Sequence, residues 1–297
     1  MNLKKTTLTI AIGTMGCFLI SYVSASLAQL DTQQFFPVAV AKKYQEVSNP
    51  HVSVSMKQDY DTKNLTEFEL HGKYTDIEVV PSSSNQLSMS WKGTISKFDQ
   101  TKPPVSVSDD GLTMTMTIDQ TENDNSLIQL GGDSGSGFIQ LEVPKNIQKV
   151  VLKTVSGNIQ LHKVNLKGLR VQVVSGDTLI ENSDIENISS QSVSGDLKIT
   201  GPIKRLSGAS ISGDMDLEIA NASPIIDLKT TSGDCHFKFN VDPQVTIQYY
   251  SISGSASIDP ELGPSPADGS KFSAQVGQGT GLISVKTTSG DAAYIRK

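Results

Sequence analysis

The chain has 297 residues, of which 37% are hydrophobic and 6% aromatic, and its formal net charge at pH 7 is −6. A chain of this length and composition can bury a core, which excludes a disordered protein. The acidic balance argues against nucleic acid as a partner, because binding to phosphates depends on a basic surface.

Residues 1–30 have the pattern of a signal peptide or a membrane anchor. Lys4-Lys5 precede an apolar stretch, and no further charge occurs before Asp31. Ser26-Leu27-Ala28 offers the small residues that a signal peptidase needs, whereas the same stretch is long enough to span a bilayer as a hydrophobic helix. The sequence leaves cleavage and retention open. Both place the rest of the chain outside the cytoplasm, with the two lysines on the inner side.

The exported part is more acidic than the whole chain and has one cysteine. Loss of residues 1–30 removes two lysines and no acid, so the net charge falls from −6 to −8. Cys17 lies in the leader, where lipidation is a further alternative that Thr14 disfavours, since an aliphatic residue is expected there. Cys235 is then alone, so no intrachain disulfide can form, and its position in the pattern predicts a core residue.

A Ser-Gly tripeptide recurs through the second half of the chain. Successive serines are 19, 19, 18, 20, 21 and 36 residues apart, and the last interval predicts a coil whose tripeptide is lost or looped out. A fixed period in this range is typical of stacked coils. The predicted structural turns are Ser156-Gly157, Ser175-Gly176, Ser194-Gly195, Ser212-Gly213, Ser232-Gly233, Ser253-Gly254 and Ser289-Gly290.

The segments on both sides of each tripeptide predict β-strands. Apolar residues recur every second position, as in Leu197/Ile199 after one glycine and Ile226/Leu228 before another, and a small Ser or Thr commonly follows the earlier pair. Glycine suits each bend because the coils are stacked about 4.8 Å apart. A side chain at the bend would recur in every coil and crowd the backbone of the next one. The neighbouring Ser and Asp, Asn or Ser supply short oxygens that can accept the N–H groups of the bend.

These patterns predict an all-β fold, a parallel β-solenoid of about 19-residue coils, similar to a single-stranded β-helix and preceded by an N-terminal hydrophobic helix. The expected parts are a leader at 1–30, a juxtamembrane stalk at 31–64, an initial β-rich part at 65–137 and the repeat solenoid at 138–297. The stretch 259–281 is rich in Pro and Gly and predicts a surface excursion, after which the last tripeptide closes the stack.

The segments Thr75–Pro81 and Leu141–Pro144, the repeated Val-Ser-Gly-Asp-Leu and the terminal 281–291 resemble the bacterial "putative adhesin" family of unknown function, which includes LiaG-like proteins. The similarity covers about residues 65–297. It implies a β-solenoid domain at the cell envelope, in some members encoded near envelope-stress systems, and it carries no catalytic or ligand residues across to this chain.

One set of residues could hold metal ions. Stacking would place Asp177, Asp196, Asp214 and Asp234 at one corner of four coils, as a track for Ca²⁺. Asn158 and Ser255 occupy the same position in flanking coils. A site that needs negative ligands should not alternate with neutral ones, whereas a bend that needs a short acceptor tolerates all three, so turn capping is the favoured interpretation and no cofactor is expected.

The sequence favours a non-enzymatic protein of the cell envelope, a display or interaction scaffold for adhesion or envelope stress. Its expected partner is an envelope protein or a cell-wall component, and the membrane itself if the leader stays attached. His51, His71, His162 and His236 form no metal-spaced pair, and no serine lies in a Gly-x-Ser-x-Gly motif. The alternative is a glycan-processing enzyme with its site near residues 259–281.

Overall fold

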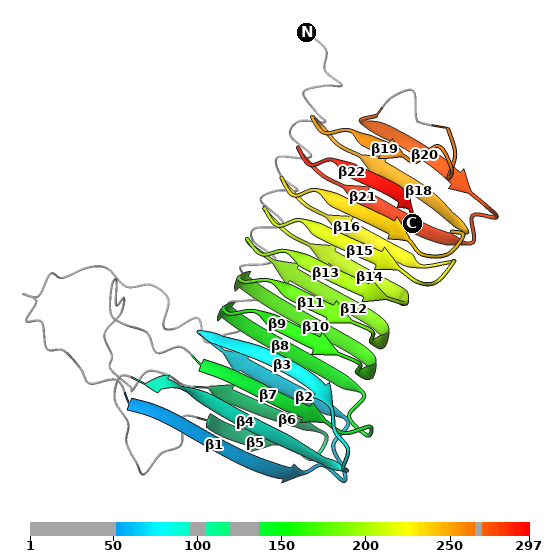
Figure 1. The fold of residues 1–297 in the computed structure, drawn as a ribbon. Coiled ribbons are helices and arrows are strands. Elements are labelled where there is room, and N and C mark those ends of the chain that lie inside the picture. Colours follow the sequence, from blue (N-terminus) through cyan, green and yellow to red (C-terminus); the bar gives the residue numbers. More distant parts are fainter. Residues whose placement is uncertain (1–51, 96–104, 119–136, 265–268) are drawn as a thin grey trace, which may run out of the picture.

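The computed structural model describes residues 52–95, 105–118, 137–264 and 269–297. These residues form two 11-stranded sheets, here called sheet A and sheet B, and no helix (Figure 1). The all-β solenoid-like fold predicted from the sequence is therefore confirmed. The leader and the hydrophobic helix expected within it lie outside the described residues. No described helix has the length and apolar character that a membrane span requires.

Each coil of the repeat contributes one strand to each sheet, and the repeat strands run parallel. In spatial order, sheet A consists of β1 (Val52–Asp61), β4 (Gln86–Ile95), β7 (Gly137–Val143), β3 (Thr75–Pro81), β9 (Ile159–His162), β11 (Thr178–Glu181), β13 (Leu197–Gly201), β15 (Met215–Ile219), β17 (Cys235–Phe239), β22 (Ala292–Arg296) and β19 (Ala256–Ile258). Sheet B consists of β20 (Lys271–Val276), β18 (Val245–Tyr250), β21 (Gly281–Lys286), β16 (Ile225–Lys229), β14 (Ile203–Ala209), β12 (Asp184–Ser192), β10 (Asn165–Ser175), β8 (Lys149–Ser156), β2 (Glu67–Gly72), β6 (Thr113–Ile118) and β5 (Val105–Asp109). The pairs β1–β4, β4–β7, β5–β6 and β18–β20 towards the two ends are antiparallel.

The core lies between the two sheets and is built from the alternating apolar positions. Equivalent residues of successive coils are in register, so Leu197 pairs with Met215 and Met215 pairs with Cys235. All three side chains are buried, with exposed fractions of 4% or less. The core also holds aromatic side chains, and the rings of Phe237 and Tyr294 stack with their centroids 4.7 Å apart.

The order of the coils in space differs from their order in the chain at the C-terminal end. The last coil, β21–β22, lies between coil β16–β17 and coil β18–β19, because β21 pairs with both β16 and β18 and β22 pairs with both β17 and β19. The expectation that the last tripeptide closes the stack is therefore wrong. The preceding tripeptide lies in the outermost coil, and the chain returns inward to end one coil below it.

In the described part of the long interval between the last two tripeptides, no strands form a further parallel coil. Residues 259–281 instead supply β20, which pairs antiparallel with β18 and forms the outer edge of sheet B. The excursion expected there is thus a short strand that covers the edge of β18. The two-period spacing reflects the length of this detour and of the return to β21, so periodicity alone could not reveal it.

The N-terminal end of the stack is interleaved in the same way. Coil β2–β3 lies between coil β6–β7 and coil β8–β9, and the antiparallel strands β1, β4 and β5 complete the two edges. The sequence interpretation assigned residues 31–64 to a stalk, but β1 falls in this range and pairs along its whole length with β4. The expected start of the repeat at residue 138 falls within β7, which pairs with β3 and β4 rather than with a repeat strand.

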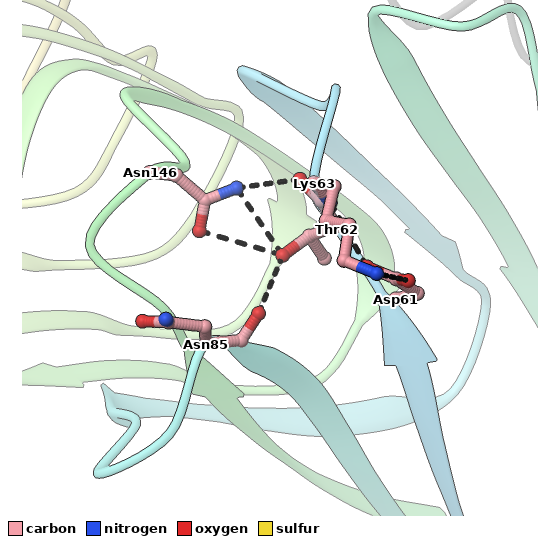
Figure 2. A network of polar contacts seen from close by, with 5 residues as sticks. All are labelled: Asp61, Thr62, Lys63, Asn85 and Asn146. Atoms are coloured by element: carbon pink, nitrogen blue, oxygen red, sulfur yellow. Dashed lines mark hydrogen bonds and ion pairs between the residues drawn. The ribbon is translucent and has the colours of Figure 1, made fainter.

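Three loops at this end are joined by a polar network (Figure 2). The Asn146 side-chain amide donates to the carbonyl oxygens of Thr62, at 2.6 Å, and of Leu65, at 3.1 Å. The fully buried Thr62 hydroxyl donates to the carbonyl oxygen of Asn85 at 3.0 Å. The loop after β1 is thereby held against the β3–β4 and β7–β8 connections, which positions β1 at the edge of sheet A.

The interleaved C-terminal coil gives a testable prediction for local stability. We expect the backbone amides of β22 to exchange with solvent as slowly as those of β17, although β22 ends at the chain terminus, because the strand is paired on both sides. Amides on the outer side of β19 should exchange faster. Native-state hydrogen exchange measures this, and exchange of β22 as fast as that of a fraying terminus would contradict the observed coil order.

Candidate functional site

The Ser-Gly tripeptides lie together at one corner of the solenoid, and this corner column is the candidate site. Each one lies where a sheet B strand ends and before the next sheet A strand, as Ser194-Gly195 does between β12 and β13, and Ser156 and Ser175 are themselves the last residues of β8 and β10. The corners follow the spatial order of the coils, so Gly290 lies between Gly233 and Gly254. The structure therefore brings all seven predicted turns into one column.

The glycines are required by the close approach of successive backbones. A Cβ atom at Gly195 would overlap the carbonyl oxygen of Gly176, and the same overlap recurs at every step of the column from Gly157 to Gly254. Gly176 also has a φ of 146°, which L side chains rarely adopt. No flexible neighbour could move aside, because the obstructing atoms belong to the backbone of the adjacent coil.

Asp76 and the third residues of the tripeptides form a hydrogen-bond ladder along the column. The Oδ1 atom of each accepts the backbone N–H of the equivalent residue in the next coil, with N···O distances of 2.7 to 3.0 Å. The ladder runs from Asp76 through Asn158, Asp177, Asp196, Asp214, Asp234 and Asp291 to Ser255. The sequence-based candidate track for Ca²⁺ thus lies within a longer ladder in which one oxygen of each residue is already engaged.

Two further sets of hydroxyl groups complete the corner. The tripeptide serines of four coils donate to a carbonyl oxygen one coil away, as Ser232 Oγ does to Ile211 O at 3.3 Å. The second set was not given a role from the sequence: buried hydroxyls three residues before the glycine accept its backbone N–H at 2.7 to 2.9 Å. These residues are Ser210, Thr230, Ser251 and Thr287, and the small Ser or Thr before the tripeptide was their sequence signal.

The histidines, which could act in catalysis or bind a metal, are distributed over the fold. His162 lies 3.2 Å from Glu181 and His236 lies 2.9 Å from Asp216, both as pairs between neighbouring strands of sheet A. His51 lies outside the described residues. Within the described ranges no cluster of three or more His, Cys, Asp or Glu could hold a metal ion.

Cys235 is fully buried in β17, between Met215 and Ala292. Burial raises the pKa of its thiol to about 12, and the nearby carboxylates of Asp234 and Asp214 contribute in the same direction. The thiolate is the reactive form of cysteine, so this side chain is held in its unreactive form at neutral pH.

A half-buried ionic group lies on the outer face of sheet B. The Glu69 carboxylate contacts Lys153 Nζ at 2.9 Å and His71 Nε2 at 3.4 Å. Burial, together with the charge of Lys153, lowers the pKa of His71 and favours its neutral form. Burial alone would raise the pKa of Glu69, but the hydrogen bond and charge of Lys153 outweigh it and lower that pKa. The group is a local ion pair that spans β2 and β8.

The corner glycines give a prediction with a matched control. Gly195→Ala should lower the free energy of unfolding by about 3 kcal/mol, because the new Cβ meets a backbone carbonyl that cannot move without separating two coils. Gly168→Ala in β10 is the control, since its Cβ would meet only the Lys149 side chain at an ordinary contact distance of 3.5 Å. Urea denaturation measures both, and equal losses would show that the corner does not limit stability.

The ladder gives a second prediction. Asp214→Ala removes the acceptor of the Asp234 N–H and should cost about 1 kcal/mol, whereas Asp214→Asn keeps an acceptor, as Asn158 does, and should change stability by less than about 0.5 kcal/mol. Thermal unfolding with and without calcium distinguishes the two roles of the column. A rise in Tm on adding Ca²⁺ that Asp214→Asn abolishes would instead identify a cation track.

Comparisons with known proteins identify the family of the chain. No curated protein matches its sequence significantly. Three similar solved structures are a "putative adhesin" from Bacteroides fragilis (15% identity, TM-score 0.48, 82% of this chain and 97% of that one), a "putative adhesin" from Parabacteroides distasonis (12%, 0.42, 81% and 97%) and a "putative lipid binding protein" from the same species (14%, 0.40, 81% and 96%). The model of the Toastrack DUF4097 family matches residues 65–293. The chain is therefore a member of the Toastrack DUF4097 family.

Proposed function

We propose that this protein is a non-enzymatic scaffold of the cell envelope, displayed outside the cytoplasm, with a LiaG-like role in adhesion or envelope stress. The observation that supports it best is the commitment of the corner residues to the stack. The Ser hydroxyls and the Asp carboxylates, which would be the first candidates for catalysis, form hydrogen bonds between coils. The polar groups of the repeat thus maintain a rigid body, and its outer faces remain for contact.

The outer face of sheet B offers a specific contact region. Ile225 of β16 and Leu282 of β21 lie opposite each other on neighbouring strands, and their side chains are 44% and 37% exposed. Arg205 of β14 lies opposite Ile225 on its other side and is also exposed. Exposed apolar side chains that lie side by side are a feature of protein-binding surfaces, where arginine is also enriched. We assign the partner to the proteins of the envelope.

The placement outside the cytoplasm rests on the leader. The lysine pair, the uncharged stretch and the small residues before Gln29 have the order of an export signal or anchor. The exported part has one buried cysteine and so can fold without disulfide chemistry. Its stability comes instead from the sheet hydrogen bonds and the apolar interior.

Retention of the full chain on isolated envelope fractions tests the proposal. We expect the purified protein to bind membrane-protein fractions, and expect the double variant Ile225→Ser/Leu282→Ser to reduce retention about tenfold, because it removes the apolar contact area. The matched control is Asp214→Asn, a corner substitution away from this face, which should bind as the native protein does.

Two outcomes would count against the proposal. Equal retention of the native chain and the double variant would remove the assigned surface from the contact. Turnover of peptidoglycan or wall polysaccharide by the purified protein would show an enzyme, and its loss on replacing the 259–281 excursion with a short turn would place the activity there.

A further inference from the structure

β1 forms the outer edge of sheet A at the N-terminal end of the stack (Figure 1). It has 10 residues, and among the described strands it pairs with β4 alone. An edge strand leaves the backbone N–H and C=O groups of its outer side without a strand partner and so offers a template for another strand. β19, the edge of the same sheet at the other end, has only 3 residues. The long edge is therefore at the N-terminal end.

The two faces of β1 carry different kinds of side chain. Met56 and Tyr60 lie on the core face, opposite Trp91 and Leu87 of β4, and both pack only partly against the core. Lys57 and Asp59 lie on the outer face and are exposed. The end of the core is thus incompletely covered by β1, and another strand placed beside β1 would bury more of the two partly exposed side chains.

We propose that β1 pairs antiparallel with β1 of a second copy of this chain, around a twofold axis through Gln58, so that sheet A continues from one copy into the other. In this register Lys57 lies opposite Asp59 of the second copy, and the symmetry repeats the pair on the other side of the axis. Met56 lies opposite Tyr60 of the second copy in the same way. A self-complementary patch of this kind is what a twofold interface requires.

The register follows from the charges and the pleat. Residues directly opposite each other must lie on the same face, which excludes every shift by a single residue. A shift by two residues in one direction places Lys57 opposite Lys57 of the second copy. The same shift in the other direction places Asp59 opposite Asp59 of the second copy. Like charges directly opposite each other destabilise a strand pair. The register centred on Gln58 avoids both and sets Lys57 opposite Asp59 twice. The shift that sets Asp59 opposite its own copy would also pair Lys57 with Asp61, but it keeps two like charges directly opposite each other at the axis.

Sedimentation of the full chain in detergent over a concentration series tests the pairing through charge reversal. We expect the native chain to dimerise, and Lys57→Glu or Asp59→Lys alone to weaken the dimer at least about tenfold, because each places like charges opposite each other twice. The double variant Lys57→Glu/Asp59→Lys exchanges the two charges and should restore most of the affinity. Asp59 also accepts a hydrogen bond from Ser88 at 2.5 Å, so thermal unfolding must show that each variant stays folded.

Cross-linking tests the register independently of the charges. In a Cys17→Ser background, Gln58→Cys should form a disulfide between two copies, because residues paired across an antiparallel ladder have Cα atoms about 4.5–5.5 Å apart, within the range of disulfides. Cys235 is fully buried and does not compete. Ser53→Cys is the matched control, since its two copies would lie 10 residues apart along the strands, or about 33 Å.

The outcomes are distinct. Restoration by the double charge reversal, together with cross-linking at residue 58 and not at residue 53, supports the interface. A native chain that stays monomeric throughout the concentration series would overturn it, as would a double variant as weak as the single ones, or equal cross-linking at both positions. None of these results depends on the contact region assigned to sheet B, so the two proposals can fail separately.

Discussion

The close approach of successive backbones at the corner determines the rest of this structure. The carbonyl oxygen of each corner glycine occupies the place where a Cβ atom of the next glycine would be. Only under this condition can the strands on both sides of the corner hydrogen-bond in register, from Leu197 to Met215 and on to Cys235. The alternation of apolar residues then faces a single continuous interior. Corner spacing, sheet register and core are therefore consequences of one geometric constraint.

The same constraint explains the role of the polar residues of the repeat. Backbones that turn at a stacked corner leave N–H groups that strand pairing does not satisfy, and a buried donor without a partner is costly. The carboxylates of Asp214 and Asp234 and the hydroxyl groups of Ser210 and Thr230 accept them. Carboxylates repeated at strand spacing repel one another, but at an exposed corner this amounts to about 1 kcal/mol per pair. The hydrogen bonds offset this cost, so the acidic column is compatible with a structural role.

The repeat and its corners could be predicted from the sequence because their causes are local. A glycine with short polar neighbours and alternating apolar residues has the same meaning in every coil. The neighbour of each coil could not be predicted, for the same reason. Ser289-Gly290 fits equally well on top of Gly254 or between Gly233 and Gly254, and only packing against distant residues, such as Tyr294 on Phe237, favours the second arrangement. The place of Asp76 at the start of the hydrogen-bond ladder could not be predicted from the sequence, because its segment carries no tripeptide.

Interleaving at the two ends changes what limits the stability of the stack. In a simple solenoid the terminal coil has one neighbour and can detach alone. Here the last residues of the chain lie in coil β21–β22, which is paired on both sides. The coil outside it is held by the pairing of β18 with β21 and of β19 with β22, and by the Tyr249 hydroxyl, which donates to Gly290 O at 2.6 Å. Releasing the last strands of the chain therefore requires the separation of two coil interfaces, whereas the outermost coil has one. The chain order that periodicity does not encode is thus a cause of rigidity at the end of the stack.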